Sequence, residues 1–180
     1  FVSGHCVPTG RQWLHRLCAP IADSQADYTY GRQLGGPTSR FSETRIFAKY
    51  FPEATQLPQI GFFCNNANSA ISRSAWQTYR FDEELTGLED MELARRLVDD
   101  GGLVGYVAEA AVYHHHAETW AQVRRRFERE AIALRRIMPQ IQVAWHDALR
   151  YVASSIALDL REAARQGRTL RLAAEIVRYR

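Results

Sequence analysis

LEDMELARRLVDDGGLVGYVAEAAVYHHH, residues 88–116, changes from a helical to an extended pattern at its two glycines. The first half predicts a helix, because apolar residues recur at steps of three and four. They are Leu88, Met91, Leu93, Ala94 and Leu97. Gly101 and Gly102 end this helix in the manner of a C-cap. The second half predicts two short extended pieces, 103–107 and 110–113, that deliver three histidines to a loop.

The same alternation of extended and helical segments precedes residue 88. A strand end and turn at 1–8 lead into a helix around Trp13, Leu14 and Leu17. A strand is predicted at 28–32, a helix at 41–51 and an asparagine-rich turn at 65–68. Such alternation is typical of an α/β fold with a mostly parallel sheet.

From Thr119 onward the pattern is wholly helical, with breaks at Pro139 and Gly167. We therefore expect two units, the α/β part at residues 1–118 and a helical extension at 119–180.

Composition narrows the class of protein. The chain has 180 residues, of which 46% are hydrophobic, enough for one globular domain with an appendage. Its three cysteines, Cys6, Cys18 and Cys64, show no CxxC spacing, which argues against a disulfide framework and favours a reducing cytoplasm. No segment approaches the roughly 20 apolar residues that span a bilayer. We expect a cytoplasmic location, with a peripheral position on the inner face of the plasma membrane as an alternative.

Two carboxylates begin the helix at residue 88. Glu89 and Asp90 lie in its first turn, where the positive end of the helix dipole favours ionised acids. An ionised carboxylate there can take a proton from a substrate hydroxyl as a general base. The alternative is an ordinary helix start enriched in acids.

The three histidines follow an extended segment. His114 and His116, two residues apart, would point the same way and could bind a divalent metal through neutral nitrogen. His5 joins them only if the sheet brings the first strand close. The alternative is a polar strand end or a hydrogen-bonded histidine pair.

Arginines crowd the start of the helical extension, although the net charge of the chain is only +3. They are Arg124, Arg125, Arg126, Arg129, Arg135 and Arg136. Such a cluster attracts phosphates of a nucleotide, a lipid head group or a nucleic acid. The alternative is a solvated helix face.

Taken in order, these motifs resemble the second half of bacterial family 2 glycosyltransferases over residues 1 to 130. The matching pieces are Val7-Pro8, Trp13-Leu14, Tyr30-Gly31-Arg32-Gln33, Asn65 to Ala70 with Trp76, Phe81-Asp82-Glu83, Gly87-Leu88-Glu89-Asp90 with Arg95-Arg96, and Ala111 to His114 with His116. The resemblance implies a partial GT-A fold, a nucleotide-diphospho-sugar donor and inversion at the anomeric carbon. The acceptor would be a cell-envelope glycan or a lipid-linked sugar.

Site roles follow from the same resemblance. Asp90 would be the base and Glu89 would position the acceptor. Asn65, Asn66 and Asn68 would bind sugar hydroxyls, and Arg125 would reach the diphosphate. It also implies strands before Phe1 that hold the nucleotide, so we expect this polypeptide alone to be inactive and poorly stable.

The metal motif departs from the family. Its members usually carry Asp-x-Asp where this chain has Ser3-Gly4-His5. The resemblance implies Mg²⁺ or Mn²⁺, but a hard cation prefers oxygen ligands. His5, His114 and His116 are the candidate ligands here.

Three other readings stay open. A metal-dependent hydrolase would need further ligands at a spacing such as HExxH, which the sequence lacks. A nucleic-acid binder is disfavoured, because the arginine run lacks aromatic interleaving of the kind that stacks bases and the chain is only weakly basic. An inactive fragment or a non-catalytic α/β domain that binds anions or a membrane surface is the remaining alternative. The helical extension could also form a homodimer.

Overall fold

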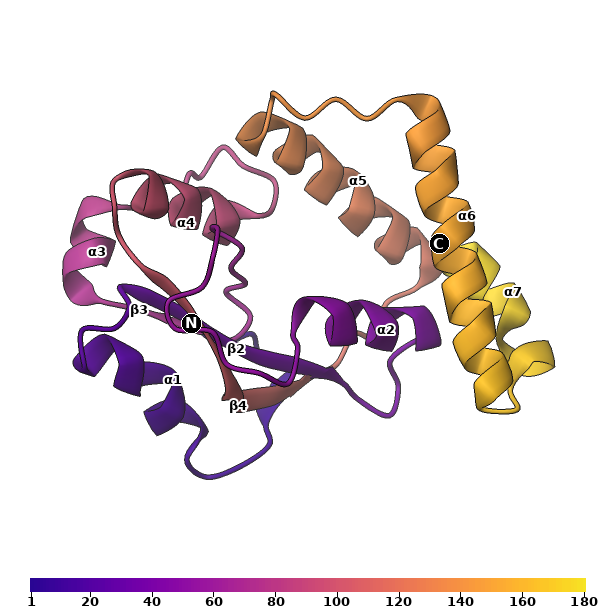
Figure 1. Ribbon diagram of the computed structural model, residues 1–180, viewed down its shortest axis with the longest axis horizontal. Helices are drawn as coiled ribbons and strands as arrows, with labels where there is room; N and C mark the ends of the chain where they lie inside the picture. The colour runs from indigo at the N-terminus through magenta and orange to yellow at the C-terminus, as the bar shows by residue number, and fades with distance from the viewer.

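The computed structural model describes all 180 residues and contains four strands and seven helices (Figure 1). The strands are β1 (Cys6–Pro8), β2 (Tyr28–Gly35), β3 (Ser69–Ile71) and β4 (Val104–His114). The helices are α1 (Trp13–Ala22), α2 (Phe41–Tyr50), α3 (Arg73–Thr78), α4 (Glu89–Asp99), α5 (Trp120–Ile137), α6 (Trp145–Arg165) and α7 (Thr169–Tyr179). The α/β class predicted from the sequence is confirmed.

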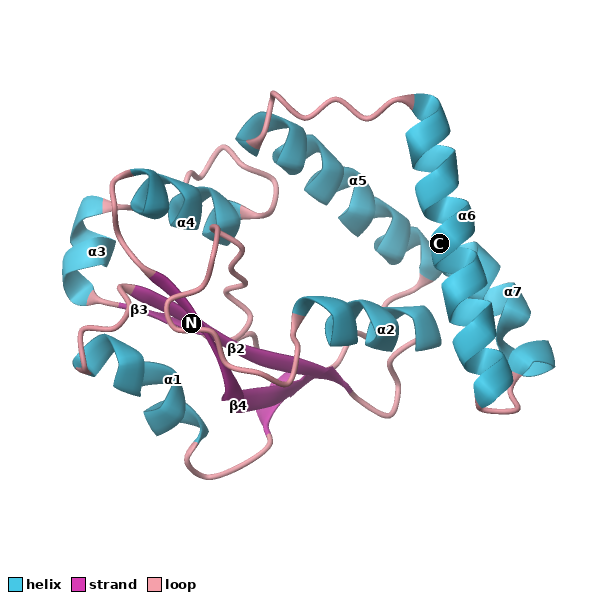
Figure 2. Ribbon diagram, viewed as in Figure 1, coloured by secondary structure: helices cyan, strands magenta, loops and turns pink.

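The sheet is mixed, with strand order β1-β4-β2-β3 (Figure 2). Only the two long central strands, β2 and β4, pair in parallel, while β1 and β3 pair antiparallel to their neighbours. The prediction of a mostly parallel sheet is therefore wrong. Helices that alternate with strands in the sequence do predict the parallel pairing of β2 with β4. The edge strands β1 and β3 have only three residues each, too few for the sequence to indicate their direction.

Most elements lie close to their predicted positions. Helix α4 begins at Glu89 and is followed by Gly101, whose φ of +88° supplies the left-handed conformation of a helix end. The two extended pieces predicted after it form one continuous strand, β4. Helix α3 was not predicted, because its six residues have no helical repeat.

Helices cover both faces of the sheet. On one face, Leu17 of α1 packs against Val107 and Ala110 of β4. On the other face, α2, α3 and α4 enclose the main core, which includes the fully buried Tyr28 and Leu93. The result is a three-layer body whose α2 and α4 lie on the same side.

One glycine permits the central strands to meet the asparagine turn. A Cβ atom on Gly31 would lie 2.1 Å from the carbonyl oxygen of Ala110 and 2.3 Å from Nδ2 of Asn68. Only a residue without a side chain allows this approach. β2, β4 and the turn at 65–68 are thus held in direct contact.

The last three helices extend beyond this body and contact it at several places, of which the following two lie at opposite ends. At the far end of α5, Arg136 pairs with Glu84 of the loop before α4 (2.7 Å). At the other end, Glu175 of α7 accepts a hydrogen bond from the backbone N–H of Phe41 at the start of α2 (2.8 Å). The boundary at residues 118/119 stays a prediction. None of the helices is long and apolar enough to cross a membrane.

Candidate active site

Asp90 faces the asparagine turn from the first turn of α4. Its Oδ2 accepts a hydrogen bond from the backbone N–H of Asn66 (2.6 Å), and its Oδ1 accepts one from Met91 N–H (2.7 Å). Glu89 Oε1 in turn accepts from the side-chain amide of Asn66 (3.2 Å). Both predicted acids therefore contact the turn that was predicted to border the sugar.

Burial raises the pKa of Asp90 to about 6, with a smaller contribution from the neighbouring charge of Glu89. The N–H donors of Asn66 and Met91 oppose this rise, because they stabilise the ionised form. The expectation from the helix dipole was a fully ionised acid, and burial outweighs it in part. A carboxylate with a pKa near 6 is suited to accept a proton at neutral pH.

The side chains of the asparagines in the turn differ in their hydrogen-bond partners. Asn65 Oδ1 accepts from Gln33 Nε2 (2.8 Å) and from Ala67 N–H (3.1 Å). Asn68 is fully buried, accepts from Trp13 Nε1 (2.7 Å) and donates to the carbonyl oxygen of Ala110 (2.7 Å). The amide of Asn68 is thus occupied inside the protein, which favours a structural role over the predicted sugar contact.

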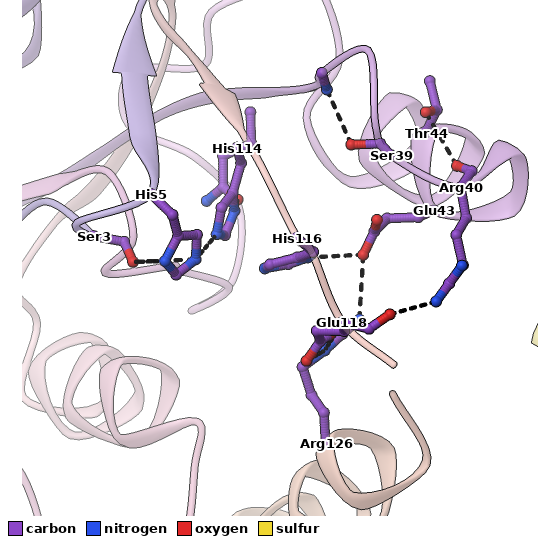
Figure 3. A network of polar contacts seen from close by, with 12 residues as sticks. Ser3, His5, Ser39, Arg40, Glu43, Thr44, His114, His116, Glu118 and Arg126 are labelled. Atoms are coloured by element: carbon purple, nitrogen blue, oxygen red, sulfur yellow. Dashed lines mark hydrogen bonds and ion pairs between the residues drawn. The ribbon is translucent and has the colours of Figure 1, made fainter. Parts of the chain in front are cut away.

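Three histidines converge at the carboxyl end of β4. Antiparallel pairing places Cys6 of β1 opposite His114, which brings His5 to the same end of the sheet. His5 Nε2 lies 2.8 Å from His114 Nε2, and the ring centroids of His114 and His116 are 4.1 Å apart (Figure 3). His115 lies outside the cluster and packs near Gly36 and Tyr113. The predicted alternation of His114 and His116 is therefore present, and His5 meets its stated condition.

Burial and the nearby imidazoles of His116 and His5 lower the pKa of His114 to about 3. Burial also lowers the pKa of His5. His114 Nδ1 lies 2.6 Å from Gln33 Oε1, an acceptor, so this nitrogen carries the proton. The imidazole of His114 is thus neutral, with its Nε2 lone pair directed at the cluster.

Two polar residues beside the histidine cluster were not among the predicted site residues, Glu43 of α2 and Arg126 of α5. Glu43, only 3% exposed, contacts His116 Nδ1 (2.7 Å) and Arg126 (3.2 Å) through the same oxygen. Arg126 also pairs with Glu118 (2.9 Å). Within the predicted arginine run, Arg126 rather than Arg125 reaches Glu43, the partner of His116. Arg125 is exposed and borders a separate small depression with Gln122 and Arg129.

A cleft of about 1450 Å³ joins these groups. Its polar wall contains the histidine cluster and the asparagine turn. The residues are His5, Gln33, Glu43, Asn65, Asn66, His114, His116 and Arg126. Leu88 and Met91 line it beside Asp90, so the buried carboxylate lies next to the cleft wall. Apolar residues of α2, α5 and α6 line the rest, among them Tyr50, Phe127 and Leu158.

Hydrogen bonds on either side of the Asn65–Asn66 peptide link connect the histidines with the carboxylate. Gln33 bridges His114 and Asn65, and the next residue, Asn66, donates to Asp90. The sheet, the turn and α4 thus form a single wall of the cleft.

Comparison with known proteins gives one informative similarity. No protein-family model matches the chain. The O-antigen chain rhamnosyltransferase WbaN of Salmonella anatum is 30% identical to it over 122 residues, which is 66% of this chain and 34% of that protein. The chain is similar to a sugar transferase. It spans about a third of the length of this relative, so the similarity supports a glycosyltransferase role at the general level.

The different positions of Asn68 and Asn66 predict different effects on stability. We expect Asn68→Ala to lower the free energy of unfolding by about 1–3 kcal/mol, because Trp13 Nε1 and the Ala110 carbonyl would lose their buried partner. Asn66→Ala, which keeps the backbone N–H bonded to Asp90, is the control and should cost less than about 1 kcal/mol. Urea denaturation measures both, and equal losses would contradict the structural role of Asn68.

Proposed function

We propose that this chain belongs to the catalytic part of an inverting glycosyltransferase, with Asp90 as the base that activates the acceptor hydroxyl. The observation that carries the proposal is the position of Asp90, a carboxylate with a raised pKa beside a cleft and hydrogen-bonded to the asparagine turn. The similarity to a rhamnosyltransferase supports sugar transfer as the reaction.

In the proposed reaction, Asp90 removes the proton from an acceptor hydroxyl. The resulting oxygen attacks the anomeric carbon of a nucleotide-diphospho-sugar, and the bond from that carbon to the diphosphate oxygen breaks on the opposite face. This displacement inverts the anomeric configuration. Each oxygen of Asp90 has a lone pair beyond the one used by a backbone N–H, so it can accept the proton. Asn66 and Glu89 would hold the acceptor.

The cleft also offers positive charge for a diphosphate. Arg45 and Arg180 both pair with the buried Asp159 (3.5 and 2.8 Å), and Lys49 lies on the same lining. Two guanidinium groups thus share the carboxylate of Asp159, and together with Lys49 they would attract an anionic group on a donor or on a lipid-linked acceptor. The roles predicted for Asn65 and Asn66 are kept in this proposal, whereas Arg126, which lines the cleft, replaces Arg125.

Asp90→Asn tests the base directly. In the polypeptide that carries this sequence, we expect kcat to fall by about 10²–10⁴-fold, because the amide cannot accept the proton. With Asp90 intact, kcat/KM should fall about tenfold for each pH unit below 6, since protonation at a pKa of about 6 removes the base, and should be flat above it.

The matched control is Asp99→Asn, which changes an exposed acid at the other end of α4 and should leave kcat unchanged. Full turnover in Asp90→Asn, or a pH profile without an inflection near 6, would remove the assignment of the base.

A membrane surface is a second proposed partner. Trp145, Leu149 and Val152 form a stripe on α6 in which Trp145 is 75% exposed, and the exposed Arg150 adjoins it. Such a helix face can rest on anionic lipid.

Liposomes with anionic lipid should carry the protein in flotation, and Trp145→Ser should reduce the floated fraction. Equal flotation with anionic and with neutral lipid would contradict this proposal. If the stripe is instead a homodimer interface, the protein would sediment as a dimer.

A further inference from the structure

We propose that His5, His114 and His116 form a binding site for a first-row transition-metal ion such as Zn²⁺, instead of the Mg²⁺ that oxygen-rich sites hold. The proposal deepens the proposed function, because the ion would lie in the polar wall of the same cleft. One ring nitrogen of each histidine lies within 4.8 Å of the others, and the three come from the turn before β1, the end of β4 and the segment after β4.

The other ring nitrogen of each histidine has an oxygen partner. Nδ1 of His114 donates to Gln33 Oε1 (2.6 Å), and Nδ1 of His116 lies 2.7 Å from Glu43 Oε1. Ser3 Oγ lies within hydrogen-bond distance of both ring nitrogens of His5, 3.2 Å from Nδ1 and 3.3 Å from Nε2. When Nδ1 carries the proton, Nε2 keeps its lone pair, and such outer contacts orient the histidines of metal sites.

The Nε2 atoms are placed for a shared ligand. Those of His5 and His114 lie 2.8 Å apart, the distance of the hydrogen bond that joins the two rings, and tetrahedral binding of one ion at about 2.0–2.1 Å from each would require them to move only to about 3.3 Å. Figure 3 shows the ring of His116 extending from Glu43 toward this pair. Since all three histidines line the cleft, the remaining side of an ion would be open to an oxygen of a substrate.

The charge around the cluster favours a cation. Glu43 and Glu118 both pair with Arg126, so two carboxylates meet one guanidinium. Glu43 is buried beside His116, where a positive ion would be stabilised by its charge. The excess of negative charge lies next to the three imidazoles, which have no formal charge when neutral.

The donor set selects the ion. Mg²⁺ requires near-octahedral oxygen ligands, and three imidazoles do not supply them. Imidazole nitrogen suits zinc, iron, cobalt and related ions, with Mn²⁺ the weakest of the series. The replacement of the Asp-x-Asp carboxylates by Ser3-Gly4-His5 is thus accompanied by two further histidines, one at the end of β4 and one two residues later. A bound ion would supply Lewis-acid charge stabilisation at this end of the cleft.

The test measures metal binding without sugar substrates. A chelator first removes metal from the purified polypeptide. Binding of Co²⁺ is then measured by its visible absorption, and binding of Zn²⁺, Mn²⁺ and Mg²⁺ is measured by calorimetry. We expect one equivalent of Co²⁺ or Zn²⁺ to bind and Mg²⁺ to bind at least about tenfold more weakly. His5→Ala and His116→Ala, which alter the less buried ligands, should each weaken Zn²⁺ binding by about tenfold or more.

The matched control is His115→Ala, from the same segment but outside the cluster, which should bind Zn²⁺ like the unchanged protein. Glu43→Gln provides a variant that keeps all three ligands and should weaken binding by about 10- to 100-fold. Tight Mg²⁺ binding, absence of Zn²⁺ binding, or equal loss in His115→Ala would overturn the proposal. Sugar transfer that persists in Asp90→Asn would instead overturn the proposed function and leave the ion site standing.

Discussion

The side chain of Gln33 joins the two halves of the candidate site. It is 1% exposed, accepts a hydrogen bond from His114 and donates one to Asn65. The parallel pairing of β2 with β4 places Gln33 opposite Val112, two residues before His114, so the amide lies beside the histidine. A buried amide without both partners would cost free energy, and the bridge therefore fixes the turn relative to the sheet.

The bridge explains why the buried carboxylate of Asp90 in α4 lies next to the same cleft that His114 of β4 lines. The turn held by Gln33 presents the N–H of Asn66 to Asp90, which in turn fixes the first turn of α4. On the other side of the cleft, Arg126 reaches Glu43 and attaches the helical extension to the same polar wall. Burial raises the pKa of Asp90 and lowers that of His114, so each group is shifted toward its neutral form.

The sequence predicted those parts of the site whose geometry is local. Helix periodicity located Asp90 in the first turn of α4, and strand alternation placed His114 and His116 on one side. Arg125 and Arg126 could not be separated in this way, because a step of one residue turns about 100° around a helix and the run of arginines obscures which face is inward. Asn66 and Asn68 look alike in sequence, and only tertiary contacts show that Asn68 is enclosed by Trp13 and Ala110.

The most direct test of this arrangement is side-chain ¹⁵N NMR of the metal-free protein as a function of pH. The structure predicts that His114 keeps its proton on Nδ1 and stays neutral from pH 8 to about 4, because burial lowers its pKa to about 3. A His114 imidazole that gains its second proton near the ordinary pKa of 6.5 would show that it is not buried against Gln33. The single polar wall described for this cleft would then not exist.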